Sequence, residues 1–131
     1  MARYGAAVMV VIAGWLAFRF PLGELWSPQT YEITPHVRAE DAAMARVPDG
    51  VTVETTLAML APLAARDDTY WIGLYPNPAP AFIVFDEYNS GFPAPANPLA
   101  FVEQRHHGWA YLRIFHDNGV DVFRRVGRTG G

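Results

Sequence analysis

The sequence contains neither cysteine nor lysine, and each absence narrows what the protein can be. Zero cysteine among 131 residues excludes a disulfide framework, a thiol nucleophile and a cysteine-ligated metal. The ten basic residues are all arginine, and with abundant alanine, glycine and proline this is typical of GC-rich bacterial genomes such as those of actinobacteria. A formal net charge of −3 offers no basic stripe of the kind that nucleic-acid binding requires.

Recognisable catalytic motifs are missing as well. No serine stands in a triad motif, and no glycine-rich phosphate loop is present. His106 and His107 are adjacent, so on a helix they would not face one metal ion. His36 and His116 each stand alone and are expected to be solvated. The sequence therefore assigns no catalytic residue, no metal ligand and no cofactor, and it favours a chain that is not an enzyme by itself.

What the chain does contain, near its start, is a long uncharged run, Gly5–Phe18, which is apolar on every helical face. The Arg19 side chain can reach an interface, which would carry the apolar region on to Leu22, and Trp26 is placed for a membrane's aromatic belt. With Arg3 before the run, this predicts one helix that crosses the cell membrane once, leaving the rest of the chain extracytoplasmic. A cleaved signal peptide and a buried helix remain as alternatives, because a full span needs ~20 residues.

The middle of the chain alternates strand and helix patterns. Val51–Thr55 is β-branched, Leu57–Arg66 is a helical run, and Tyr70–Tyr75 and Ala81–Phe85 are short apolar runs. Parallel strands need a crossover connection, usually a helix, so this order predicts parallel pairing among the three strands. Continuous apolar runs are typical of strands that are covered on both faces.

The end of the chain predicts a hairpin. Asn118 and Gly119 stand between two alternating runs, which is the strongest short hairpin signal. Further helices are expected at Val37–Val47 and Asn97–His107. The predicted fold class is therefore α/β: a small three-layer, mostly parallel sheet with a C-terminal antiparallel hairpin, preceded by the transmembrane helix.

Four parts follow from these patterns. We expect a transmembrane helix with its interfacial flank in 1–26, a linker in 27–36, a soluble α/β domain in 37–126 and a flexible tail in 127–131. The expected core consists of apolar residues from the predicted strands and helices: Val51, Val53, Leu60, Leu63, Ile72, Leu74, Ile83, Phe85, Phe101, Leu112 and Ile114.

Polar side chains follow two of the predicted strands. Asp86 and Glu87 come directly after Ala81–Phe85, and Thr55 and Thr56 end the earlier strand. Ligands of open α/β sheets bind at the carboxyl ends of strands, so these four residues are candidates for one ligand-binding pocket. The alternative is structural, with Asp86 capping a turn and Thr56 capping a helix.

The order of five short motifs resembles a known family. The motifs are Ala45–Val53 (ARVPDGVTV), Leu60–Arg66 (LAPLAAR), Gly73–Pro76 (GLYP), Ala81–Asp86 (AFIVFD) and Asn118–Arg125 (NGVDVFRR). They look like the soluble C-terminal region of uncharacterised bacterial "predicted membrane proteins", a domain of unknown function grouped with GT-C-type glycosyltransferases. The resemblance covers roughly residues 5–126. The catalytic acids of GT-C enzymes lie in loops between early membrane helices, which this chain lacks, so no catalytic role carries over to a residue here.

Two functions from different classes follow. The resemblance implies a non-catalytic, membrane-anchored module that is accessory to glycan or lipid-linked sugar assembly, with a membrane-protein partner or self-association. That role needs a sealed sheet and an exposed apolar surface. The alternative is a small stand-alone ligand-binding domain or enzyme that uses the sheet edge at Asp86. It needs a cleft beside Asp86 and shifted titration there.

Overall fold

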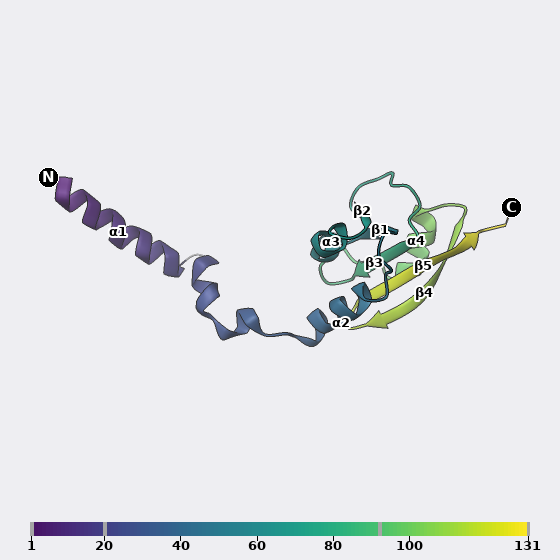
Figure 1. Ribbon diagram of the computed structural model, residues 1–131, viewed down its shortest axis with the longest axis horizontal. Helices are drawn as coiled ribbons and strands as arrows, with labels where there is room; N and C mark the ends of the chain where they lie inside the picture. Colours follow the sequence, from purple (N-terminus) through teal and green to yellow (C-terminus); the bar gives the residue numbers. More distant parts are fainter. Residues whose placement is uncertain (1, 20, 92, 131) are drawn as a thin grey trace. The chain divides into compact units, whose positions relative to one another are not determined.

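The computed structural model describes residues 2–19, 21–91 and 93–130, and it divides into two compact units, Met1–Ile33 and Thr34–Gly131 (Figure 1). The second unit carries every described β-strand and the three shorter α-helices. The division into four parts expected from the sequence stays a prediction.

The N-terminal unit contains α1 (Ala2–Arg19) and two 3₁₀ helices, Pro21–Trp26 and Pro28–Tyr31. Within the described residues, no helix combines the length and the apolar character needed to cross a bilayer, so the expected transmembrane helix is wrong. The physical reason is length. The uncharged run Gly5–Phe18 rises only about 21 Å at 1.5 Å per residue, against about 30 Å of hydrocarbon. The helix ends at an arginine, and the segment that was expected to extend it begins a 3₁₀ helix at a proline.

The second unit is built on one five-stranded sheet with the order β2-β1-β3-β5-β4. The strands are β1 (Thr52–Thr55), β2 (Asp68–Trp71), β3 (Phe82–Asp86), β4 (Trp109–Asp117) and β5 (Val120–Arg128). β1 pairs in parallel with β2 and β3, whereas β5 pairs antiparallel with β3 and β4.

The sheet is therefore mixed, and the expected mostly parallel sheet is wrong. The hairpin signal predicts that β4 and β5 pair with each other, but it does not say which strand the hairpin joins. β5 pairs along the whole of β3 and also with β4, so two of the four strand pairings are antiparallel. The turn itself follows its chemistry, since Asn118 and Gly119 both have positive φ (44° and 77°).

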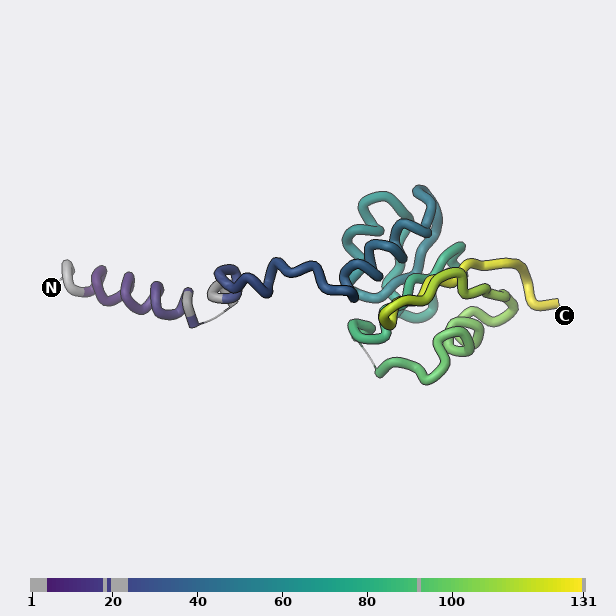
Figure 2. The backbone as a smooth tube through the Cα atoms, turned by 90° about the horizontal axis from the view of Figure 1, so that it is seen from below, coloured from purple at the N-terminus to yellow at the C-terminus, as the bar shows by residue number. Residues whose placement is uncertain are grey.

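Helices cover both faces of the sheet (Figure 2). α2 (Pro35–Met44) and α3 (Leu57–Ala64) pack on one face, and α4 (Pro98–Arg105) packs on the other. Side chains of a strand alternate between faces, so each strand contributes to two cores. The core under α2 and α3 contains Val53, Val84 and Val122, and the core under α4 contains Ile83, Phe85 and Phe123.

The expected core is partly wrong at the sheet edges. Val53, Leu63, Ile72, Ile83 and Phe85 are buried as expected. Leu74 and Leu112 are instead 58% and 51% exposed. Leu74 lies in the loop beyond the end of β2, and Leu112 lies on β4, an outermost strand with a neighbour on one side only.

Candidate functional site

Asp86 ends β3 and is fully buried. Its Oδ1 accepts a hydrogen bond from the Tyr88 backbone N–H at 2.8 Å, so the carboxylate does cap a local turn. Its Oδ2 lies 3.2 Å from Nε2 of His36 on α2. Asp86 therefore has the structural role and also a contact across 50 positions of sequence.

His36 and Glu40 lie one turn apart on α2, on the helix face that meets the end of β3. Nδ1 of His36 is 2.9 Å from the backbone oxygen of Asn118, and because a carbonyl only accepts, Nδ1 carries the hydrogen. Nε2 of His36 is 3.9 Å from Oε1 of Glu40. One potential ligand atom from each of His36, Glu40 and Asp86 lies within 4.8 Å of the others. We call these three residues the Asp86 cluster.

Two groups of the Asp86 cluster have shifted pKa values. Burial lowers the pKa of His36, but the Asn118 carbonyl and the carboxylates of Asp86 and Glu40 outweigh it, so the net pKa is raised. Burial raises the pKa of Glu40, and nearby Asp86 and Asp41 add to the increase, against a lowering by His36. Both groups therefore keep a proton to higher pH than they would in water.

Thr55 ends β1, and Thr56 follows at the N-cap position of α3. Both are buried, and within the described residues the Oγ1 atom of each has no hydrogen-bond partner. The expected capping bond of Thr56 is therefore absent. Thr55 stands opposite Val84, which places Thr55 and Asp86 on the same face near the carboxyl ends of neighbouring strands. Buried hydroxyls without hydrogen-bond partners destabilise the fold, so a ligand that bonded to them at this edge would gain free energy.

A hollow of about 520 Å³ adjoins this edge. Its lining comes from the start of α3 and from the segment after β3: Leu57, Ala58, Tyr88, Asn89 and Gly91. Tyr88 also touches the Asp86 cluster, because its ring packs edge-on against His36 with centroids 5.2 Å apart.

Glu87, the fourth predicted residue, belongs to a different group. It lies with His116 and Asp121, again with potential ligand atoms within 4.8 Å. Asp121 stands opposite Phe85 in the sheet, so it is on the α4 face, whereas Asp86 is on the α2 face. The structure thus gathers three of the four predicted residues at one edge and separates Glu87. His36 is half-buried against the Asp86 carboxylate, so it is not freely solvated as expected. The His116 side chain is exposed as expected, and it also contacts the buried Asp121 carboxylate.

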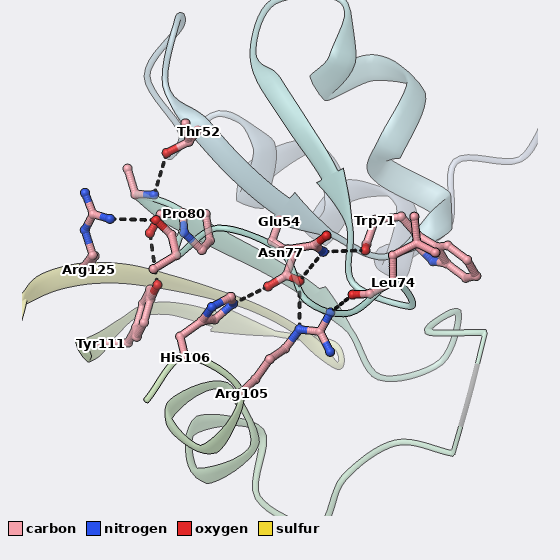
Figure 3. A network of polar contacts seen from close by, with 12 residues as sticks. Thr52, Glu54, Trp71, Leu74, Asn77, Pro80, Arg105, His106, Tyr111 and Arg125 are labelled. Atoms are coloured by element: carbon pink, nitrogen blue, oxygen red, sulfur yellow. Dashed lines mark hydrogen bonds and ion pairs between the residues drawn. The ribbon is translucent and has the colours of Figure 1, made fainter. Parts of the chain in front are cut away.

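A further buried carboxylate lies on the α4 face, at Glu54 on β1 (Figure 3). Its Oε1 accepts hydrogen bonds from Nδ2 of Asn77 at 2.7 Å and from Nε of Arg105 at 2.8 Å. Its Oε2 lies 2.6 Å from Nε2 of His106. These four residues, the Glu54 network, tie the C-terminal end of α4 and the loop after β2 to the sheet.

The Glu54 network stabilises the charged form of Glu54. Burial raises the pKa of Glu54, but hydrogen bonds from His106, Asn77 and Arg105 outweigh it and lower the net pKa. Nearby, burial raises the pKa of Tyr111 to about 12, so its hydroxyl stays protonated and donates to the backbone oxygen of Pro80 at 3.0 Å.

A shallow groove borders the Glu54 network. It consists of two adjoining hollows of about 270 and 290 Å³ that share Tyr75, Arg105 and His107. The Arg105 guanidinium lies over the Tyr75 ring at 5.4 Å, and Arg125 lies over the ring of Trp109, which also lines the groove, at 4.5 Å. The groove therefore presents aromatic rings and positive charge.

The sequence did not predict the Glu54 network, and it predicted the Asp86 cluster only in part. Glu54 lies inside the predicted strand Val51–Thr55, and the signal for it was a charged residue in a strand expected to be covered on both faces. His36 and Glu40 have the i, i+4 spacing of one helix face, which was the available signal for the Asp86 cluster.

No protein-family model, curated protein or solved structure matches this chain. The resemblance to the GT-C-associated membrane proteins therefore stays a prediction.

Proposed function

We propose that the second unit binds a small ligand at the carboxyl edge of β1 and β3. The observation that supports this is a set of buried oxygens without hydrogen-bond partners in the described structure, Oγ1 of Thr55 and Thr56 and Oε1 of Glu40, beside a hollow of about 520 Å³. Small-molecule sites are hollows of roughly 300–1,000 Å³ with a few convergent polar groups. They occur at the carboxyl ends of strands in open α/β sheets.

The two functions considered from the sequence make different demands, and these favour the sheet edge. Ligand binding at Asp86 needs a cleft beside it and shifted titration there. The hollow at Tyr88 supports the first demand, and the raised pKa values of His36 and Glu40 support the second. An accessory module that packs through a sealed sheet requires neither.

The lining suggests the chemistry of the ligand. Leu57, Ala58 and the Tyr88 ring offer an apolar and aromatic wall, and Asn89 adds an amide. The nearby carboxylates favour a positively charged or hydrogen-donating end on the ligand. A flat apolar body with such an end fits both features.

A titration of the ¹⁵N-labelled protein with benzylamine, which joins a flat ring to a cation, tests this proposal. Chemical-shift changes are expected at the amides of residues 57–58 and 88–91, and benzoate, the anionic counterpart, should cause smaller ones. Ala58→Trp should fill the hollow and abolish the changes. Ala61→Trp, at an exposed position of the same helix, is the matched control. Equal changes in both variants, or changes at the groove instead, would contradict the proposal.

The groove beside the Glu54 network favours a second candidate, a non-catalytic module accessory to glycan or lipid-linked sugar assembly. Its support is the pairing of arginines with aromatic rings, since guanidinium groups bind phosphates and rings stack on sugars. Titration with a uridine diphosphate sugar checks it, with shifts expected at His107 and Trp109. No shift there would remove this candidate.

A further inference from the structure

The ligand atoms of the Asp86 cluster have the spacing that one small metal ion requires. Nε2 of His36 lies 3.2 Å from Oδ2 of Asp86 and 3.9 Å from Oε1 of Glu40. Around a tetrahedral ion with bonds of about 2.0–2.2 Å, ligand atoms stand roughly 3.3–3.6 Å apart. The two separations from His36 are therefore close to this geometry, and all three ligand atoms lie within 4.8 Å of one another.

His36 is oriented as a metal ligand. Its Nδ1–H donates to the Asn118 carbonyl, so in the neutral ring the lone pair is on Nε2, the atom that faces both carboxylates. Metal-binding histidines commonly donate their other ring N–H to a carbonyl or carboxylate in this way. The Tyr88 ring packs against the imidazole in an edge-to-face arrangement, which limits the rotation of the imidazole.

The charges of the cluster also match a divalent cation. Glu40 and Asp86 supply two carboxylates, and within the described residues neither forms an ion pair with an arginine. Asp86 is fully buried, and Oε1 of Glu40 is buried with no hydrogen-bond partner in that same part of the chain. A bound cation would neutralise both groups and satisfy the unpaired oxygen.

The neighbouring group of Glu87, His116 and Asp121 also holds a fully buried carboxylate, and Oδ2 of Asp121 has no hydrogen-bond partner in the described residues, but its charges differ. Oδ1 of Asp121 already lies 2.9 Å from Nδ1 of His116 and 3.5 Å from the Arg113 guanidinium. An arginine at that distance repels a cation, and the His116 side chain is 52% exposed. This group serves as the comparison site.

We propose that Nε2 of His36, Oε1 of Glu40 and Oδ2 of Asp86 bind one zinc ion, with a fourth position left open. One imidazole with two carboxylates suits zinc better than magnesium or calcium, which favour oxygen ligands alone. Three protein ligands and an open position are the pattern of zinc sites that bind a water or a ligand. The inference goes beyond the proposed function, because no residue that lines the hollow ligates the ion, although both proposals draw on Oε1 of Glu40.

Calorimetric titration of the full-length, chelator-treated protein with zinc chloride at pH 7.5 tests the proposal. One zinc per chain is expected. Removing a group that only orients a ligand typically weakens metal affinity about 10–100-fold, so Glu40→Gln and His36→Gln, which remove ligands, should weaken it by at least about tenfold. The matched controls His116→Gln and His107→Gln should bind as the unaltered protein does. Because metal displaces protons, affinity should also rise with pH.

Cobalt substitution supplies a second readout that does not depend on heat. The visible absorption of bound Co²⁺ should change in His36→Gln and stay the same in His116→Gln. Urea midpoints of the metal-free variants establish that each one folds. The proposal is overturned if folded Glu40→Gln binds zinc as tightly as the unaltered protein, if His116→Gln alone loses binding, or if magnesium or calcium is preferred to zinc.

Discussion

Two fully buried carboxylates lie on neighbouring strands of one sheet, and they differ in how they are satisfied. Glu54, on the α4 face, receives hydrogen bonds from Arg105 and Asn77 and contacts His106. Asp86, on the α2 face, has a histidine and a second carboxylate, Glu40, beside it. In the described part of the chain it has no arginine.

Of the two carboxylates, Glu54 has the structural role. A buried charge is tolerated when partners of opposite sign satisfy it. Every hydrogen-bonding oxygen of Glu54 is engaged, so the Glu54 network needs nothing from outside. The Asp86 cluster has an excess of negative groups and an unpaired oxygen on Glu40, so it is better suited to an added cation.

The largest expected effect on stability comes from substituting Glu54, whose oxygens are all hydrogen-bonded. Glu54→Gln should lower the free energy of unfolding by about 3–5 kcal/mol, because it leaves the largely buried Arg105 without its counter-ion. Urea denaturation at pH 7 measures this. The control Glu103→Gln, at an exposed position on α4 near Arg105, should change stability by less than about 0.5 kcal/mol. A loss under about 1 kcal/mol for Glu54→Gln would show that the network is not a structural tie.

The Glu54 network should also make the stability of the protein depend on pH in the acid range. The folded pKa of Glu54 lies below its ordinary value of 4.5, so its stabilisation is present above pH 4.5 and is lost as the pH falls through the folded pKa. The groups that face it are His106, Arg105, Asn77 and Tyr111. Stability measured from pH 6 to pH 2.5 should therefore fall less steeply in Glu54→Gln than in the unaltered protein. Parallel curves would contradict the lowered pKa.

A neutral hydrogen bond beside the network should matter less. Tyr111→Phe removes the donor to the Pro80 carbonyl and should cost about 1 kcal/mol in urea denaturation. Because the pKa of Tyr111 is about 12, this cost should be the same at pH 7 and pH 9. A cost that disappears at pH 9 would mean that the hydroxyl ionises there.

The Asp86 cluster should respond in the opposite sense when metal is absent. Glu40→Gln should leave the stability at pH 7 unchanged or raise it by up to about 0.5 kcal/mol, since the raised pKa means that folding disfavours the charged form. The raised pKa of His36 gives stability that is present below pH 6.5 and lost as the pH rises through the folded pKa. In buffer with a chelator, a clear loss of stability in Glu40→Gln would contradict this prediction. It would mean that the Glu40 carboxylate already has stabilising partners in the metal-free protein.

Local patterns predicted much of the second unit, and pairing across the sheet explains most of the errors. The crossover from Val51–Thr55 through α3 and the turn at Asn118-Gly119 follow from neighbouring residues. The mixed sheet could not be predicted, because the docking of β5 on β3 joins segments more than 30 positions apart. The transmembrane prediction was wrong because apolar character was weighed above length.

For the candidate site too, the residues marked by local sequence patterns were predicted, and those brought in by tertiary packing were not. Asp86, Thr55 and Thr56 were found because strand ends are visible in the sequence. His36 and Glu40 were missed, because their contact with Asp86 depends on how α2 lies over the sheet. Glu54 and its partners Arg105 and His106 stand about 50 positions apart, and no local pattern links them.

The most direct test of the contrast between the two carboxylates is a crystal structure of the protein grown with zinc, with anomalous data collected at the zinc absorption edge. We predict one strong anomalous peak, within about 2.0–2.2 Å of His36 Nε2, Glu40 Oε1 and Asp86 Oδ2, and no peak at Glu54. A peak at Glu54, or at His116 and Asp121 with none at Asp86, would contradict the account.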